Sequence, residues 1–346
     1  MASSKLLDSP FMKACRREPV PYTPIWLMRQ AGRYMKEYRD VRAKTDFLGL
    51  CKHPDLAAEV TVYAAEKLGV DAAIIFSDIL LVLEPMGLHL EYAQGEGPLI
   101  RNPIRRASDV ENLRPVEVEE SLGFVMEAIR KTRASLNSAL PLIGFSGAPY
   151  TVASYAVEGT GSRECQTTKA FMRENPKAWH TLLEKLTKVL ADHLTAQIHA
   201  GVEAVQIFDS WAGSLSPHEY EQWVWPHSRQ LIQRLPQGVP VIHFGTKTAP
   251  FLELFAAAGG DVIGVDGGIA LDQAWNRIGA SAIQGNLDPT VLLKDPDAIR
   301  SEAAKILDQA SGRPGHIFNL GHGVLQNTPV EHVQLLVEFV HESSRR

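Results

Sequence analysis

Two arginines four residues apart, in the stretch MRQAGRY at residues 28–34, directly follow the apolar run TPIWLM. A spacing of four would put the Arg29 and Arg33 guanidiniums on one face of a helical turn. Each guanidinium is a fixed cation whose planar set of donors matches a carboxylate. Two isolated arginines are more often solvated at a protein surface. Whether this pair forms an anion site therefore depends on the residues that surround it in the fold.

The composition is that of an ordinary globular protein and limits where an anion could bind. The chain has 346 residues, of which 45% are hydrophobic and 22% charged, and its formal net charge is −5. This charge gives no general attraction to nucleic acid or to an anionic membrane, so an anion site has to be local. No run approaches the ~18 apolar residues that a membrane span needs. We therefore expect neither a membrane nor a nucleic-acid partner.

The cysteines favour a reducing compartment. Cys15, Cys51 and Cys165 are far apart and form no CxxC pair, which argues against a disulfide framework and against a cysteine-rich zinc site. The N-terminal residues contain no apolar segment of signal-peptide length. We expect a cytoplasmic protein or, for a processed plant form, a plastid one.

Eight short apolar runs predict strands along the whole chain. They lie at residues 23–28, 71–76, 141–145, 201–208, 239–244, 261–265, 281–285 and 316–320. Longer segments between them carry helix signals, with Pro54 and Gly69 bounding one and Pro176 and Gly201 another.

Two further segments begin with capping-box patterns. In one, Ser216 lies three residues before Glu219, and in the other Thr328 lies three before Glu331. Pro226 is expected to kink or divide the first of these two helices.

Apolar strands that alternate with helices predict a parallel sheet buried on both faces. Eight such units favour an α/β fold with one (β/α)8 TIM barrel. We expect it to span residues 1–346 as a single domain, with a short N-terminal extension before about residue 10. A doubly wound sheet is the competing architecture, and the lack of a GxGxxG after the first strand weakens its dinucleotide-binding version.

In such a barrel the residues after each strand gather at one mouth. The polar and glycine residues at these positions are Arg29, Arg33, Ser77, Asp78, Ser146, Gly147, Asp209, Ser210, Gly245, Asp266, Asn286, Gly321 and His322. Each has a structural interpretation as well: Asp78 as an N-cap, His322 as a histidine bonded to a neighbouring loop, Asp209 and Asp266 as loop or cap residues.

The mouth would combine arginines, one strongly placed acid and apolar walls. The chain has no Walker A loop and no GxSxG elbow, so phosphoryl transfer and the usual serine acyl transfer have no support. A polyanionic small molecule is the ligand that this combination favours, with Arg42 as a further candidate cation.

Six motifs in order resemble the uroporphyrinogen decarboxylase family: WLMRQAGRY, AAIIFSDIL, GAPYTVASYAVEG, FDSWAG, QGNLDP and NLGHGV, spread over about residues 22–340. The resemblance implies a (β/α)8 carboxy-lyase that needs neither cofactor nor metal and forms a homodimer. It would remove carbon dioxide from the four acetates of uroporphyrinogen III, giving coproporphyrinogen III for haem and chlorophyll synthesis.

The resemblance also implies roles for individual residues. Asp78, Arg29 and Tyr155 would be catalytic, with Asp78 stabilising a protonated pyrrole ring. The substrate-binding set would be Arg29, Gln30, Ala31, Gly32, Arg33, Arg42, Phe76, Asp78, Tyr155, Ser210 and His322. The proton source stays open between Arg29, a substrate carboxyl and water, because an arginine has a pKa above ~12 and is a poor acid.

One position departs from the family pattern, and two other functions remain as alternatives. Gly267 in GVDGG stands where the family commonly has a tryptophan, which affects packing at one side of the mouth. A zinc-dependent methyltransferase would need a His-x-Cys after a strand, whereas this chain reads His243-Phe244-Gly245. A tetrapyrrole carrier without turnover would need the arginines but not Asp78.

Overall fold

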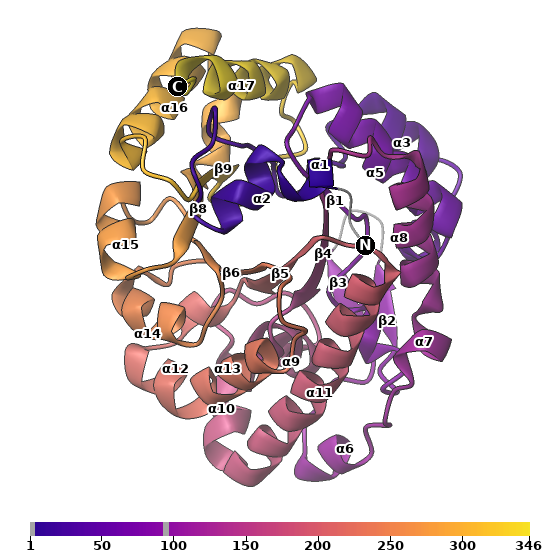
Figure 1. Ribbon diagram of the computed structural model, residues 1–346. Helices are drawn as coiled ribbons and strands as arrows, with labels where there is room; N and C mark the ends of the chain where they lie inside the picture. Colours follow the sequence, from indigo (N-terminus) through magenta and orange to yellow (C-terminus); the bar gives the residue numbers. More distant parts are fainter. Residues whose placement is uncertain (1–3, 93–96) are drawn as a thin grey trace.

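Seven parallel strands form the centre of the molecule, in the spatial order β1-β4-β5-β6-β7-β8-β9, and helices surround them (Figure 1). The structure is a computed structural model that describes residues 4–92 and 97–346. The strands are β1 Ala73–Ile74, β4 Leu142–Gly147, β5 Ala204–Asp209, β6 Val241–Gly245, β7 Val262–Gly264, β8 Ala282–Leu287 and β9 His316–Leu320. Each overlaps one of the predicted apolar runs.

Residues 23–28 occupy the eighth position, between β9 and β1. Ile25 forms an isolated parallel bridge with Phe318, and the backbone N–H of Asp71 donates to the Ile25 carbonyl at 2.8 Å. The Ile25 N–H donates to the Asp71 carboxylate instead of a strand, and Pro24 has no N–H, so no full ladder forms. The predicted single-domain α/β barrel is confirmed, whereas the predicted first strand is reduced to one bridge.

The α-helices fill the connections between strands. Their bounds are α1 Ser4–Leu7, α2 Pro10–Cys15, α3 Lys36–Arg42, α4 Phe47–Cys51, α5 Pro54–Leu68, α6 Ala107–Glu111, α7 Val118–Ser121, α8 Gly123–Ser135, α9 Pro149–Glu158, α10 Gln166–Glu174, α11 Pro176–Ala200, α12 Pro217–Trp223, α13 Trp225–Gln233, α14 Leu252–Ala257, α15 Leu271–Arg277, α16 Pro296–Ala310 and α17 Val330–Ser343. No helix in residues 4–92 and 97–346 is both long and apolar enough to cross a membrane.

Most of the predicted helix signals act as expected. Gly69 and Gly201 follow α5 and α11 with φ of 67° and 119°, a conformation that glycine adopts without strain. The Ser216 side chain caps α12 in a capping box, and the chain breaks before Pro226 to begin α13. The predicted capping box at Thr328 is wrong, because α17 begins one residue later than that pattern requires and Pro329 is its N-cap.

Inward-pointing side chains pack the interior of the barrel below the carboxyl ends of the strands. Trp26 donates from Nε1 to the Gln284 amide at 2.9 Å, and Gln284 donates to Gln206 at 2.9 Å. All three are almost completely buried. These two bonds link residues 23–28 to β8 and β8 to β5, and they give donors to two buried amide oxygens that would be costly to leave without one.

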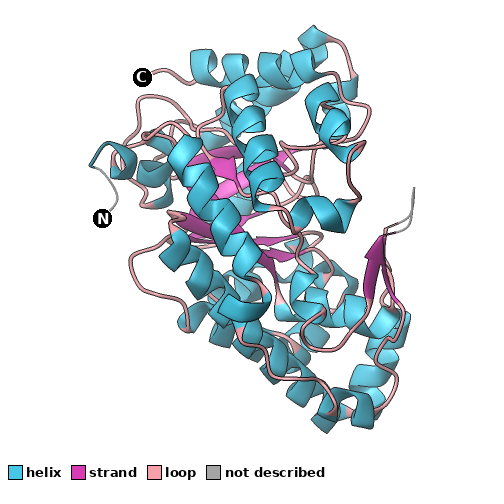
Figure 2. Ribbon diagram, turned by 90° about the vertical axis from the view of Figure 1, so that its right-hand side faces the viewer, coloured by secondary structure: helices cyan, strands magenta, loops and turns pink. Residues whose placement is uncertain are grey.

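A two-stranded antiparallel hairpin, absent from the sequence-based prediction, stands apart from the main sheet, on the side opposite the N-terminus (Figure 2). It consists of β2 Leu90–Tyr92 and β3 Pro98–Ile100. The Ile100 N–H donates to the Gly159 carbonyl at 2.7 Å, directly after α9, and Leu99 forms a bridge with Thr160. The hairpin is therefore fastened to the end of α9.

Candidate active site

A cavity of about 490 Å³ opens at the carboxyl ends of the strands. Its walls come from the ends of β4, β5 and β6, from segments that follow β1, β4, β5 and β9, from the loop after residue 28 and from the hairpin. The lining includes Arg29, Gln30, Ala31, Gly32, Arg33, Phe76, Asp78, Tyr155, Ser210 and His322. The chain thus brings ten of its eleven predicted substrate-binding residues to one space, at the end of the barrel where the (β/α)8 fold carries chemistry.

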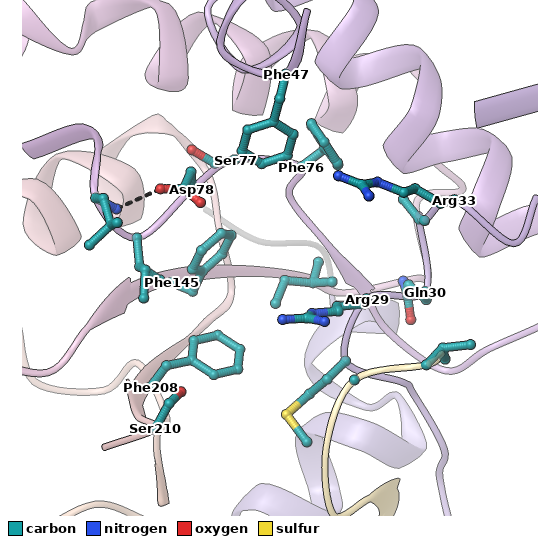
Figure 3. A pocket seen from close by; sticks show the side chains of 18 of the residues that line it. Arg29, Gln30, Arg33, Phe47, Phe76, Ser77, Asp78, Phe145, Phe208 and Ser210 are labelled. Carbon is teal, nitrogen blue, oxygen red and sulfur yellow. Dashed lines mark hydrogen bonds between the residues drawn. The ribbon is translucent and has the colours of Figure 1, made fainter. Parts of the chain in front are cut away.

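Two arginines border the cavity on one side. Figure 3 shows Arg29 and Arg33 pointing into the space that Asp78 faces from the other side. The predicted helical turn is wrong, because the segment runs through turns and Arg29 has φ of 63°, in the left-handed region. Both side chains are exposed, and neither forms an ion pair with a described residue. The pair is therefore available for an anionic ligand.

Gln30 anchors the arginine loop between these two cations. Its side-chain amide is buried, accepts from the Leu27 N–H at 3.2 Å and donates to the Ala72 carbonyl at 3.2 Å. The Tyr34 hydroxyl donates to the Gln30 carbonyl at 2.7 Å. Although Gln30 lines the cavity, these bonds make it mainly a support that fixes the loop against β1.

Arg42 lies outside the main cavity. It lines a neighbouring cavity of about 370 Å³, which shares Arg33, Tyr38 and Gln326 with the main one. Its guanidinium carbon lies 6.0 Å from the centre of the Phe47 ring, and one nitrogen donates to the Thr45 carbonyl. Arg42, a predicted substrate-binding residue, therefore borders the neighbouring cavity and not the main one.

Asp78 is the one acidic side chain among the described residues that line the main cavity. Its Oδ1 accepts from the Leu80 N–H at 2.8 Å, as drawn in Figure 3, and its Oδ2 accepts from the Tyr92 hydroxyl at 2.7 Å. The first of these bonds fixes the turn before the short 3-10 helix η1 (Leu81–Leu83), although the N-cap of η1 is Leu80. The carboxylate thus combines a turn-forming role with a free face toward the cavity.

Burial raises the pKa of Asp78, while the hydrogen bonds from Tyr92 and Leu80 and the charge of Arg29 act in the opposite direction. A carboxyl group in apolar surroundings is stabilised in its neutral form, and each donor restores part of the stability of the anion. The ionisation of Asp78 therefore depends on a few identifiable neighbours.

Tyr155, on α9, and Ser210, the first residue after β5, both line the cavity. The Tyr155 ring lies 5.7 Å from the Trp211 ring, between centroids. Burial, with the negative charge of Asp78, raises the pKa of Tyr155 to about 12, so its hydroxyl keeps its proton. The Ser210 carbonyl accepts from the Thr246 hydroxyl at 2.6 Å. This bond holds the backbone at Ser210, leaving its side chain at the cavity wall.

His322 lies at the rim after β9. Burial and the positive charge of Arg29 lower its pKa. A neutral imidazole offers one donor and one acceptor, so it can donate to a carboxylate without carrying charge.

The expected ring of strand-end residues forms only in part. Asp209 is buried beneath the cavity, where its Oδ1 accepts from the Thr151 hydroxyl at 2.8 Å and burial raises its pKa to about 7. The Asp266 carboxylate accepts hydrogen bonds from the backbone N–H groups of Lys247 and Gly268. The Asn286 side-chain amide donates to the Asp266 carbonyl. Asp266 and Asn286 therefore support the loop after β7, which for Asp266 agrees with the structural interpretation of its position.

Most of the aromatic wall consists of residues that were not predicted from the sequence. Phe145, Phe208 and Phe244 line the cavity, with centroids 5.6 Å apart for the first two and 5.9 Å for the last two. A phenylalanine at or near the end of three successive apolar runs was the available signal. Phe47 and Tyr92 add the opposite wall, their rings 4.5 Å apart, and neither stands in a recognisable motif.

The positions that a zinc-dependent methyltransferase would use are not arranged for metal. The His243 ring is completely buried and stacks on Phe255 with centroids 3.8 Å apart. Across residues 4–92 and 97–346, no group of three or more histidine, cysteine, aspartate or glutamate side chains is arranged to hold a metal ion. The donor set around His243 therefore does not fit a catalytic zinc site.

Comparison with known proteins gives a consistent family. The uroporphyrinogen decarboxylase family (URO-D) matches residues 6–343. The uroporphyrinogen decarboxylase of Carboxydothermus hydrogenoformans is 54% identical over 340 residues, covering 98% of this chain and 97% of that protein. That of Sorangium cellulosum is 51% identical over 337 residues, covering 97% and 96% of the two chains.

Among solved structures, a methyltransferase from Methanosarcina mazei matches with a TM-score of 0.83, 20% sequence identity and coverage of 98% of this chain and 99% of that one. At this identity the likeness concerns the fold alone. It agrees with the barrel described above.

Proposed function

The chain belongs to the uroporphyrinogen decarboxylase family, and we propose that the cavity at its strand ends is where uroporphyrinogen III loses four molecules of carbon dioxide to give coproporphyrinogen III. The chain is accordingly a decarboxylase that acts on a tetrapyrrole. The observation that carries the proposal is the Asp78 carboxylate, which faces across an aromatic cavity two arginines that form no ion pair within residues 4–92 and 97–346.

The arginines suit a substrate with eight carboxylates. Arg29 and Arg33 are exposed to the cavity and can each bind a carboxylate through two charge-assisted hydrogen bonds. Arg42, in the neighbouring cavity, would receive a carboxylate that reaches past Arg33. The aromatic walls would cover the apolar faces of the pyrrole rings, while Phe76 and the backbone at Ala31 and Gly32 complete the lining.

Decarboxylation of an acetate on a pyrrole needs a place for the electron pair left by the departing carboxylate. A proton added to the ring carbon next to the one that bears the acetate makes the ring cationic. The electron pair of the breaking carbon–carboxylate bond then neutralises that ring as carbon dioxide leaves. A second proton, added to the new methylene carbon, completes the methyl group, and loss of the first proton from the ring carbon restores the pyrrole. The substrate itself supplies the electron sink, so this sequence requires no organic cofactor and no metal.

Asp78 would stabilise the cationic ring. Each of its oxygens has a second acceptor position that the Leu80 and Tyr92 bonds leave free. Pyrrole N–H groups can donate to these positions, and the negative charge then lies next to the ring that becomes positive. Such preorganised stabilisation is strong in a cavity with apolar walls.

The other predicted residues would orient the substrate. Tyr155, which keeps its proton, can donate to a substrate carboxylate or to Asp78. Ser210 and His322 lie at the wall and the rim, where they can donate to further carboxylates. Arg29, a substrate carboxyl and water all fit as the source of the ring proton, and an arginine variant described below separates them.

We also propose that the whole chain forms one domain, acts as a homodimer and resides in the cytoplasm. The hydrophobic core runs from Phe11 to Val340, which supports one domain with only the first residues outside it. Three buried cysteines without disulfides suit a reducing compartment, and the relatives named above are bacterial, which favours the cytoplasm over a plastid. The dimer rests on the family resemblance.

The deciding experiment is anaerobic incubation of metal-stripped protein with uroporphyrinogen III, followed by oxidation and separation of the porphyrins by carboxyl number. We expect seven-, six-, five- and four-carboxyl products in turn. Asp78→Asn should fold and bind but lose turnover steeply, because it keeps the shape and loses the charge. Wild-type turnover in that variant would contradict the role of Asp78. If the wild-type protein bound uroporphyrinogen without converting it, the carrier alternative would be correct.

A further inference from the structure

The hydroxyl of Tyr92 donates to Oδ2 of Asp78 at 2.7 Å. We propose that Tyr92 is a positioning residue for decarboxylation, which holds the Asp78 carboxylate in its ionised form and aims its free lone pairs at the substrate. The inference rests on the proposed role of Asp78 and adds a residue that belongs to none of the six family motifs.

The hairpin fixes Tyr92 on the side of the cavity away from the arginine loop. Tyr92 is paired with Pro98 in the β2–β3 ladder, and Ile100 on the same strand bonds to Gly159 after α9. The Tyr92 ring also packs on Phe47 at 4.5 Å between centroids. The same helix, α9, carries Tyr155. The hydroxyls of Tyr92 and Tyr155 are therefore carried by two elements, the hairpin and α9, that are bonded to each other.

The bond does not compete with substrate. An ionised carboxylate has about four acceptor positions, and Asp78 uses one on each oxygen for Leu80 and Tyr92. One position on each oxygen remains for a pyrrole N–H. Tyr92 stays a donor throughout, because burial and the adjacent Asp78 charge raise the pKa of its hydroxyl far above neutral pH.

In the described part of the chain, Tyr92 is the one side chain that donates a hydrogen bond to Asp78. Other charged and titratable groups lie near the carboxylate without bonding to it. Arg29 faces it across the cavity as a cation, and Glu84 opposes the carboxylate but forms a salt bridge with Lys52 at 2.8 Å. Tyr155 and Cys51 also lie within electrostatic range, and burial keeps both neutral by raising their pKa.

Removal of the hydroxyl should therefore make Asp78 easier to protonate. A hydrogen bond to a charged group stabilises that charge, and loss of one corresponds to roughly a tenfold change in proton affinity, or about one pH unit. An Asp78 that binds a proton cannot stabilise the pyrrole cation. As the pH is lowered, the variant should therefore lose activity at a higher pH than the wild type does.

The test compares the pH dependence of kcat/KM for the wild type and Tyr92→Phe, which keeps the ring and its packing on Phe47. We expect the acid limb of the profile to move upward by about one unit, with activity at high pH within a few fold of the wild type. A titration of the Asp78 carboxyl carbon by NMR in the free protein should show the same shift without turnover.

Tyr22→Phe is the matched control. The Tyr22 hydroxyl donates to the Asp71 carboxylate at 2.9 Å, and Asp71 precedes β1 whereas Asp78 follows it. This variant loses an equivalent tyrosine–aspartate bond at the opposite end of the barrel. Its acid limb should remain at the wild-type position.

Two results would overturn the inference, and they separate it from the proposed function. If Tyr92→Phe lowers activity equally at every pH and the Asp78 titration does not move, the residue acts only through packing. If Asp78→Asn keeps wild-type turnover in the same assay, the proposed role of Asp78 fails together with the inference. An inactive Asp78→Asn with an unshifted Tyr92→Phe contradicts the inference alone.

Discussion

The side chain of Arg29 lies directly against Gly323, so that a β-carbon on this glycine would come within 2.4 Å of Cδ and 2.7 Å of Cγ of the arginine. The two residues come from opposite ends of the chain, one from the loop after residue 28 and one from the loop after β9. The course of the Arg29 side chain across the cavity wall therefore depends on the absence of a side chain at position 323.

Gly323→Ala is expected to displace the Arg29 guanidinium without unfolding the protein, because a flexible side chain rather than backbone occupies the space. The loss of a well-aligned contact between arginine and carboxylate should lower kcat/KM by about 10- to 100-fold. The measurement is steady-state decarboxylation together with a thermal unfolding scan. Unchanged kcat/KM would show that the position of Arg29 is not critical.

Arg29→Lys separates the proposed proton sources. A lysine keeps the charge but loses the planar pair of donors, so a carboxylate-orienting role predicts a substantial fall in kcat/KM. Single-turnover decarboxylation would measure the chemical step directly. Full turnover in this variant would exclude a specific role for the guanidinium and leave a substrate carboxyl or water as the donor.

Gly321 and Gly267 form a matched pair for stability. A β-carbon on Gly321 would lie 2.5 Å from the backbone nitrogen of Gly267, whereas the one described atom near a β-carbon on Gly267 would be the Asn286 carbonyl oxygen, at 3.6 Å. Gly321→Ala should therefore lower the free energy of unfolding by about 1–3 kcal/mol. Gly267→Ala should be nearly neutral. Denaturant unfolding of both variants is the measurement, and equal effects would contradict the close approach of the two loops.

Asp209 makes stability depend on pH. Its pKa in the folded protein is about 7, above its usual 3.8. The folded state therefore holds the proton more tightly, so the contribution of this group to stability is complete below pH 3.8 and is lost as pH rises through 7. Asp209→Asn removes this dependence.

Relative to the wild type, we expect Asp209→Asn to gain about 2–3 kcal/mol in unfolding free energy between pH 5 and pH 8. Denaturant unfolding at the two pH values measures this difference, which cancels the titration of all other groups. A constant offset between the two proteins would show that Asp209 is ionised across the whole range.

Periodicity and turn residues were sufficient to predict the barrel but not every detail of it. Runs of buried β-branched residues mark a strand in any parallel sheet, so seven of the runs lie on the main sheet. The run at 23–28 forms only the Ile25 bridge, because Pro24 and the Asp71 carboxylate take over its backbone partners. The hairpin was missed because each of its strands has only three residues, too few to show an alternation.

The site was predictable where it follows a strand or stands in a motif. Asp78, Ser210 and His322 come directly after apolar runs, and topology brings such residues to one mouth. Tyr92 and Phe47 reach the cavity through tertiary packing of a hairpin and a short helix, which leaves no local pattern. Arg42 shows the converse, since it lines the neighbouring cavity together with Arg33 but does not reach the main one.

The seam of the barrel has a consequence for synthesis of the chain. Ile25 bridges to Phe318, the Thr23 N–H donates to the Ser344 hydroxyl at 2.8 Å, and Asp71 accepts from His341 at 2.7 Å. On a ribosome the first partner of each pair emerges long before the second. The half of the barrel that begins at residue 23 must therefore wait with an unpaired edge until translation is nearly finished, and a strand edge left open is where nascent chains associate with one another.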